Sequence, residues 1–137
     1  MICSMRLVWS IALAAMSPVA ASRPPVPDPP TGLWINPHGS VKVMTAPCAG
    51  KLCGWIVWAS PQATMDAAAV GAPKLIGLEL LRDYHPAGPH LWRGTVYVPD
   101  MARSFASRIT QLDANRMKID GCILAGLVCK SQIWRRA

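Results

Sequence analysis

The residues with the clearest chemistry are cysteines, of which the chain has five. Four of them form two spaced pairs, Cys48 with Cys53 and Cys122 with Cys129. Four cysteines allow three disulfide connectivities. We favour a bond within each pair, because each pair encloses a plausible turn with a glycine, and a turn brings facing side chains to disulfide distance. The alternative is a four-cysteine zinc site, but such sites use tighter pairs, so we expect no metal.

The other reactive side chains form no recognisable catalytic set. The histidines, His38, His85 and His90, each lie close to a proline in a turn-like context, and no serine has a Gly-x-Ser-x-Gly context. Glu79 lies in an apolar run, and we interpret it as an outward-facing carboxylate because unpaired burial is costly. We therefore predict no enzymatic activity and no cofactor. An enzyme acting on envelope material, with Glu79 or His85 in its site, is the weakest alternative.

Aromatic side chains are the more suggestive set. Five of the six tryptophans follow residue 33, and with Tyr97 they are enough to fill a small core or line a pocket. The candidates for a ligand pocket are Trp34, Trp58, Trp92 and Tyr97. Trp55 and Trp58 are three residues apart in one expected strand. The two-residue period of a strand predicts that they lie on opposite faces, so that one of them is exposed.

Residues 1–21 are typical of a secretory signal peptide. Arg6 supplies a positive charge, residues 7–16 a short apolar run, and residues 19–21 the small side chains that a signal peptidase accepts. The run is shorter than the roughly 20 residues that a membrane-spanning helix needs. We therefore predict cleavage, no transmembrane span in the mature chain, and a periplasmic or secreted location. A retained N-terminal anchor is the alternative. Export would also favour disulfides, which persist in oxidising compartments.

The charge is basic, with 14 Lys and Arg against 7 Asp and Glu and a formal net charge of +7. A cytosolic protein with this balance would be a candidate for nucleic-acid binding. An exported one is not, and its positive residues are scattered without a basic run. We expect no nucleic-acid partner and a weak association with anionic envelope components.

The spacing of turn residues between short β-prone runs predicts one β domain. Residues 22–30 contain five prolines and are expected to form an extended leader to a single domain over 31–137. Short β-prone runs follow at 32–35, 41–47, 52–58, 75–82, 91–98, 103–109, 115–121 and 129–135. The interruption at 59–73 is predicted to be a loop or lid, with at most one helical turn at 66–70. Eight short strands indicate an all-β fold, either an antiparallel barrel or a β-sandwich.

Several of these residues together resemble a bacterial family of exported proteins, catalogued as domain of unknown function 2147. The motifs are Gly32-Leu33-Trp34, Pro47-Cys48, Leu52-Cys53-Gly54, Ile56-Val57-Trp58, Gly77-Leu78, Trp92 with Gly94, Val96-Tyr97, Gly121-Cys122, and Gln132 with Trp134 and Arg136. The resemblance covers residues 31–137. It departs at 59–73, where this chain is shorter and rich in alanine.

The relation of that family to the calycins implies a fold and a contact. The fold is an eight-stranded up-and-down barrel like that of lipocalins, and Gly32-Leu33-Trp34 is similar to the Gly-x-Trp motif that begins such barrels. The resemblance also implies that Arg136 stacks on Trp34 and closes one barrel end.

The fold and the resemblance together favour a binding function. We expect a non-enzymatic periplasmic or secreted protein that takes a small apolar or amphipathic ligand through a barrel mouth covered by residues 59–73. The alternative is an envelope structural or interaction module that uses an exposed aromatic patch around Trp55 or Trp58.

Overall fold

The computed structural model describes residues 13–19, 29–72, 74–123 and 128–137. Most of the predicted signal peptide and leader, residues 1–12 and 20–28, lies outside these ranges. No helix among the described residues is long and apolar enough to cross a membrane.

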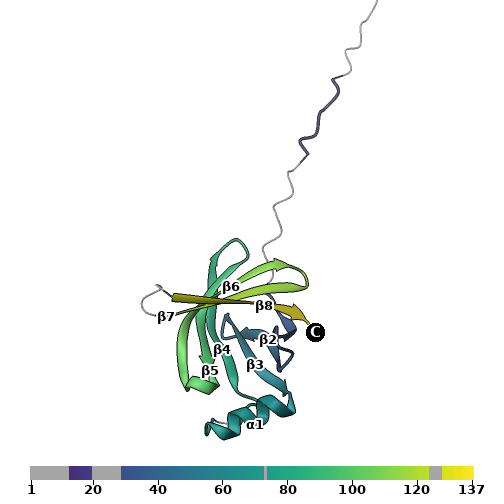
Figure 1. The fold of residues 1–137 in the computed structure, drawn as a ribbon. Helices are drawn as coiled ribbons and strands as arrows, with labels where there is room; N and C mark the ends of the chain where they lie inside the picture. Colours follow the sequence, from purple (N-terminus) through teal and green to yellow (C-terminus); the bar gives the residue numbers. More distant parts are fainter. Residues whose placement is uncertain (1–12, 20–28, 73, 124–127) are drawn as a thin grey trace, which may run out of the picture.

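The described residues form a closed antiparallel barrel of eight strands in sequence order (Figure 1). The elements are β1 (Gly32–Ile35), β2 (Val41–Cys48), β3 (Lys51–Ala59), α1 (Pro61–Ala69), β4 (Glu79–Gly88), β5 (Leu91–Val98), η1 (Pro99–Met101), β6 (Arg103–Asp113), β7 (Arg116–Ile123) and β8 (Val128–Arg136). Closure rests on β1 and β8, which pair Trp34 with Arg136 and Ile35 with Arg135. The predicted all-β up-and-down barrel is confirmed, and the sandwich alternative is wrong.

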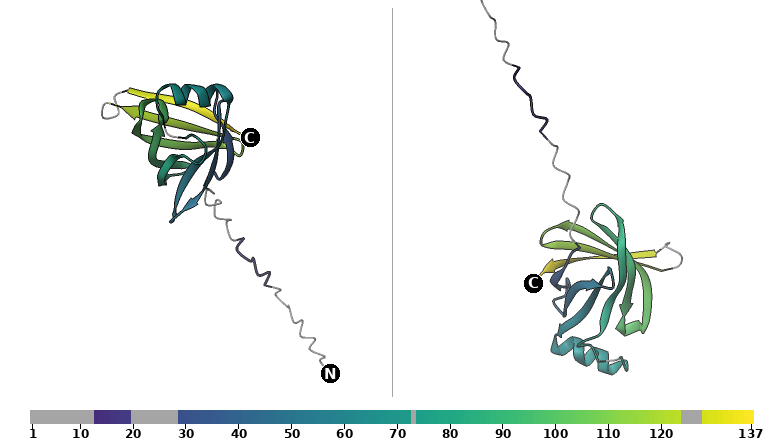
Figure 2. Two further views of the ribbon diagram at one scale, coloured as in Figure 1. Left: turned by 90° about the horizontal axis from the view of Figure 1, so that it is seen from below. Right: turned by 180° about the vertical axis from the view of Figure 1, so that it is seen from behind.

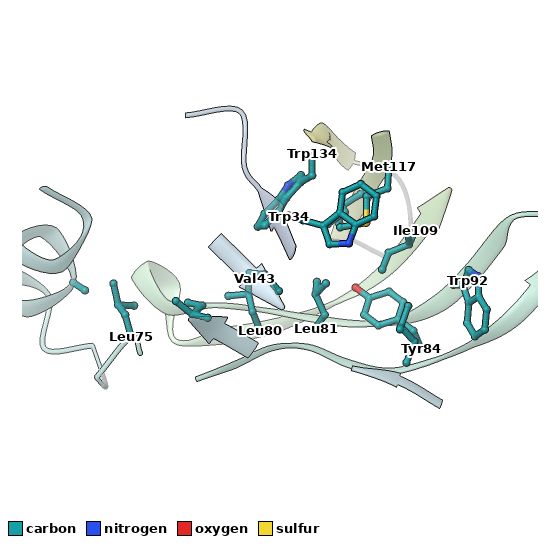
Figure 3. Packing of buried hydrophobic residues seen from close by; sticks show 14 residues of the cluster. Trp34, Val43, Leu75, Leu80, Leu81, Tyr84, Trp92, Ile109, Met117 and Trp134 are labelled. Carbon is teal, nitrogen blue, oxygen red and sulfur yellow. The ribbon is translucent and has the colours of Figure 1, made fainter. Parts of the chain in front are cut away.

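Alternation along the strands builds the core. In β2, Val43 and Thr45 are buried inside the barrel, whereas Met44 between them is 39% exposed. The same period in the other strands lines the interior with one cluster of large apolar side chains (Figure 3). The largest fully buried members are Trp34, Tyr84, Leu52, Ile56, Leu81, Ile109 and Met117. The centre of the barrel is therefore filled by side chains.

Both predicted disulfides are present. Cys48 bonds to Cys53 across the turn between β2 and β3, and Cys122 bonds to Cys129 across the β7–β8 pair. The first turn has two central residues, Ala49 and Gly50, both with positive φ (48° and 78°). Such a turn matches the twist of a hairpin, which is why the local spacing predicted the bond.

The prediction for residues 59–73 is wrong in one respect, because the segment contains the nine-residue helix α1. Ser60 caps the helix, since its hydroxyl accepts a hydrogen bond from the Ala63 N–H at 3.1 Å, and Pro61 fills the first turn. The prediction of at most one helical turn at 66–70 missed this start signal. In Figures 1 and 2, α1 lies across one end of the barrel.

The bounds of β4 also differ from the prediction. Residues 75–78 form a bend in which Gly77 has a positive φ of 87°, and β4 begins only at Glu79. It then continues to Gly88, so His85, which was assigned to a turn, lies in the strand. Within the strand, Asp83 has a positive φ of 55° and the register with β5 shifts between Arg82 and His85, which is a local irregularity rather than a chain reversal.

We predict that Ser60→Ala loosens α1 without unfolding the barrel. Loss of an N-cap destabilises a helix by about 1 kcal/mol, and the strand ladders do not depend on α1. Hydrogen exchange should accelerate in residues 61–69 and stay unchanged in β5 and β6. Ser60→Asp, which keeps a capping oxygen, is the control. Slow exchange of 61–69 in Ser60→Ala would contradict the role of the cap.

Candidate functional site

One end of the barrel is closed by Arg136 and Trp34. The guanidinium carbon lies 4.4 Å from the centroid of the buried indole, and the side chain also donates to the carbonyls of Thr31 (2.9 Å) and Ala114 (2.8 Å). Gly32 makes room for this stack, because a Cβ at that residue would lie 2.5 Å from Nη1 of Arg136, and φ there is +121°. Sterics therefore explain why the first residue of the Gly-x-Trp motif is a glycine.

The residues before β1 complete the same closure. The indole N–H of Trp34 lies 3.1 Å from the Pro30 carbonyl and 3.2 Å from the Thr45 hydroxyl, which donates to the same carbonyl. Pro30 is fully buried. The chain just before β1 therefore packs inside this end of the barrel.

The interior holds a pair of buried hydroxyls whose hydrogen bonds are incomplete. Tyr84 is fully buried and Ser107 is 5% exposed; the two hydroxyls interact with each other, but without good hydrogen-bond geometry, and neither side-chain oxygen has another partner among the described residues. Figure 3 shows the Tyr84 hydroxyl directed inward among the core side chains. Gly94 allows the ring to sit there, because a Cβ at that residue would lie 2.6 Å from Cγ of Tyr84.

This part of the interior favours neutral groups. Burial raises the pKa of the Tyr84 phenol above its ordinary value, and the nearby Ser107 hydroxyl lowers it only in part. The buried carboxylate of Asp120 does not belong to the interior. It lies on the outer face, where it accepts a hydrogen bond from Ser131 and has Arg108 and Lys118 within 4 Å.

The predicted pocket residues do not converge on one place. Trp34 and Trp92 are buried in the core, and Arg136 lies at the closed end. Tyr97 is next to the inward-facing Val96 and so faces outward, where the Arg82 guanidinium lies 4.7 Å from its ring centroid. Trp58 also faces outward and is 40% exposed.

The prediction that Trp55 and Trp58 lie on opposite faces is wrong. The register shifts within the β2–β3 pair, so that Lys42 opposes Trp58 while the next residue, Val43, opposes Ile56. The bulge leaves Val57 as an extra residue and turns Trp58 to the face that Trp55 already occupies. The two-residue period fails at a bulge, and the sequence gives no sign of this one.

The remaining candidates do not assemble into a reactive site. His38, His85 and His90 are exposed, and Glu79 opposes Trp55 at the start of β4. Within the described ranges, no group of three or more His, Cys, Asp or Glu side chains could hold a metal ion. Sequence reasoning missed Tyr84 and Ser107, because only the long-range register of β4, β5 and β6 brings them together.

The comparisons with known proteins agree with this architecture. Residues 32–136 match the family described as "Uncharacterized protein conserved in bacteria (DUF2147)". The chain belongs to this family. No curated protein matches the sequence. Among solved structures, the fold is similar to protein HP1028 of Helicobacter pylori, which is described as belonging to the lipocalin family, with a TM-score of 0.60. The identity is 15%, over 80% of this chain and 83% of that one, so the likeness concerns the fold.

We predict that Arg136→Ala destabilises this family member by about 2 kcal/mol. The variant loses a cation–π contact and two charge-assisted hydrogen bonds at the end where the barrel closes. Urea unfolding measures the difference. Arg135→Ala, which removes the neighbouring arginine on the outer face, is the matched control and should change stability by less than about 0.5 kcal/mol. Equal effects of the two variants would contradict the closure argument.

Alkaline unfolding should depend on Tyr84. The stability that this neutral buried phenol contributes is complete below its unfolded pKa of about 10, and is lost as the pH rises further, because the unfolded phenol ionises first. The wild type should lose about 1.4 kcal/mol of unfolding free energy from this group between pH 8 and 11, of which about 1 kcal/mol falls between pH 10 and 11.

The Tyr84→Phe variant should lack that component of the loss, whereas Tyr97→Phe, altered on the outer face, should retain it. Urea unfolding at pH 8, 10 and 11 compares the three proteins. The interpretation fails if the pH dependence of Tyr84→Phe is the same as that of the wild type.

Proposed function

We propose that the protein is a non-enzymatic binding protein that holds a small, mostly apolar ligand inside its barrel. The observation that carries the proposal is the pair of buried hydroxyls on Tyr84 and Ser107. A buried hydroxyl with incomplete hydrogen bonds is unfavourable, by up to about 1–3 kcal/mol where it has no partner at all, and native interiors seldom leave one in this state. A polar atom of a ligand placed between them would remove that cost.

The surroundings of the pair define the chemistry of the ligand. The neighbouring core residues are apolar, among them Leu81 and Ile109, and the raised pKa of Tyr84 reflects the same lack of charge stabilisation. The polar atom of the ligand should therefore be uncharged, as in an alcohol, ketone or amide. A free carboxylate would lose its hydration without gaining a counter-ion.

The entrance for this ligand is proposed at the barrel end that α1 covers. The helix contributes only small apolar side chains to the core, with Ala67 buried and Ala63 partly buried. Alanines bury little area, so moving α1 aside costs less than opening a strand pair. The filled centre limits the ligand to a small molecule, because core side chains have to shift to admit it.

The proposed setting is the periplasm or the exterior of a bacterial cell. Two disulfides in so small a barrel support an oxidising compartment. The proposed partners are the small ligand and anionic envelope components, not nucleic acid.

The first test is to identify what the barrel carries. Native mass spectrometry of protein purified from its own host should show a bound small molecule that organic extraction releases. Consistent absence of any such mass, together with no binding of the probes described next, would contradict the proposal.

The second test uses three probes of the same chain length: 2-undecanone, undecane and undecanoate. Displacement of the fluorophore N-phenyl-1-naphthylamine should rank 2-undecanone above undecanoate. The Tyr84→Phe variant should bind 2-undecanone about tenfold more weakly, as expected for the loss of one hydrogen bond, and should bind undecane unchanged. Tyr97→Phe is the control and should bind all probes as the wild type does. Equal losses for 2-undecanone and undecane would show that the hydroxyl plays no part in recognition.

A further inference from the structure

We propose that the outer surface of β3, β2, β1, β8 and β7 is a docking face for the anionic headgroups of a phospholipid bilayer. Its centre is one row of cross-strand neighbours, called here the docking row. The row consists of Trp58, Lys42, Ile35, Arg135 and Arg116. The proposal does not depend on a ligand inside the barrel.

The strand register places the whole docking row on one face. Lys42 opposes Trp58 and Ile35, Ile35 opposes Arg135, and Arg135 opposes Arg116. The chain neighbours of the other four residues point inward, because Val43, Trp34, Trp134 and Met117 are all buried, and the bulge in β3 brings Trp58 to the same face opposite Lys42. Side chains alternate along a strand, so the row itself points away from the core.

The docking row carries an excess of positive charge. Arg116 pairs with Asp113 at 2.8 Å, but in the part of the chain that the structure describes neither Lys42 nor Arg135 has a carboxylate within ion-pair distance. Arg135 and Arg116 also face each other directly across β8 and β7, where like charges repel. A polyanionic surface would relieve that repulsion.

Exposed apolar side chains lie among these cations. Trp58 is 40% exposed beneath Lys42, whose Nζ lies 5.2 Å from the centroid of the indole ring. Ile133, in the next row, is 42% exposed, and with Ile35 it borders a surface hollow that Arg116 and Arg135 also line. Tryptophan with adjacent cations suits the interface of a bilayer, where indole rings sit at headgroup level and ammonium and guanidinium groups bind phosphate.

The mixture of apolar residues and cations along the docking row argues against a protein partner. The centre of a protein interface is typically depleted in lysine, whereas here the apolar residues alternate with cations along the row. A second copy of the same chain would bring a face of the same sign of charge. A negatively charged lipid surface satisfies both kinds of side chain at once.

The test uses protein purified from its own host and vesicles of two compositions, phosphatidylcholine alone and phosphatidylcholine with an equal amount of phosphatidylglycerol. Co-sedimentation should show binding to the anionic vesicles and little to the neutral ones, and 0.5 M NaCl should weaken it. The double variant Lys42→Gln/Arg135→Gln should bind about 25-fold more weakly, since each cation near a membrane contributes about fivefold.

The matched control is Arg93→Gln/Arg103→Gln. These exposed arginines lie on β5 and β6, which carry no residue of the docking row, and among the described residues neither forms an ion pair, so the variant removes the same charge elsewhere. It should keep most of the affinity. Equal losses in the two double variants would mean that net charge alone attracts the protein, and would overturn the proposed face.

The Trp58→Ser variant distinguishes a bilayer partner from a soluble polyanion. We expect vesicle binding to fall several-fold and binding to dextran sulfate to stay unchanged, because only a bilayer has an interface for the indole. Unchanged vesicle affinity in Trp58→Ser would overturn the membrane assignment. A urea unfolding transition like that of the wild type, and the presence of both disulfide bonds, verify that each variant is folded. Whether 2-undecanone binds inside the barrel is measured separately, so either proposal can fail without the other.

Discussion

Closure of a barrel by a very short strand is the constraint on which this structure depends. β1 has four residues and meets β8 at two register positions, so the ladder alone supplies few hydrogen bonds there. Arg136 adds what the ladder lacks, because its side chain ties β8 to the carbonyl before β1 and to the turn after β6 while covering Trp34. Closure removes the exposed strand edges that an open sheet would leave, and the core can form only inside it.

The fold could be predicted where the information was local. The Cys48–Cys53 bond follows from a two-residue turn, and the strands from alternation between turn residues. α1 was missed although its start signal, Ser60 before Pro61, is also local. The face of Trp58 was not predictable, since it depends on a bulge that only the pairing with β2 creates.

The candidate site lay beyond sequence reasoning for a related reason. Tyr84 and Ser107 are ordinary residue types on strands that are not neighbours in the barrel order, and nothing in either segment refers to the other. Their relation arises from the register of β4, β5 and β6, and from Gly94, which gives the tyrosine ring its place. The same strand register places the predicted pocket residues Trp34 and Trp92 in the core and Trp58 and Tyr97 on the outer surface.

The inner and outer surfaces of the barrel need separate explanations, as β3 shows. Its inward residues Leu52 and Ile56 fill the core, yet its outward residues Trp55 and Trp58 are also apolar. A strand in a barrel with a water-facing exterior needs only one apolar face, so the core does not explain the second.

The interior, in contrast, contains polar groups, the two hydroxyls, that an apolar core does not require. Each face thus carries side chains that the fold alone leaves unaccounted for, and a single partner cannot satisfy both because the sheet itself lies between them. The small neutral ligand proposed for the interior and the anionic bilayer proposed for the docking row would each satisfy one of these faces.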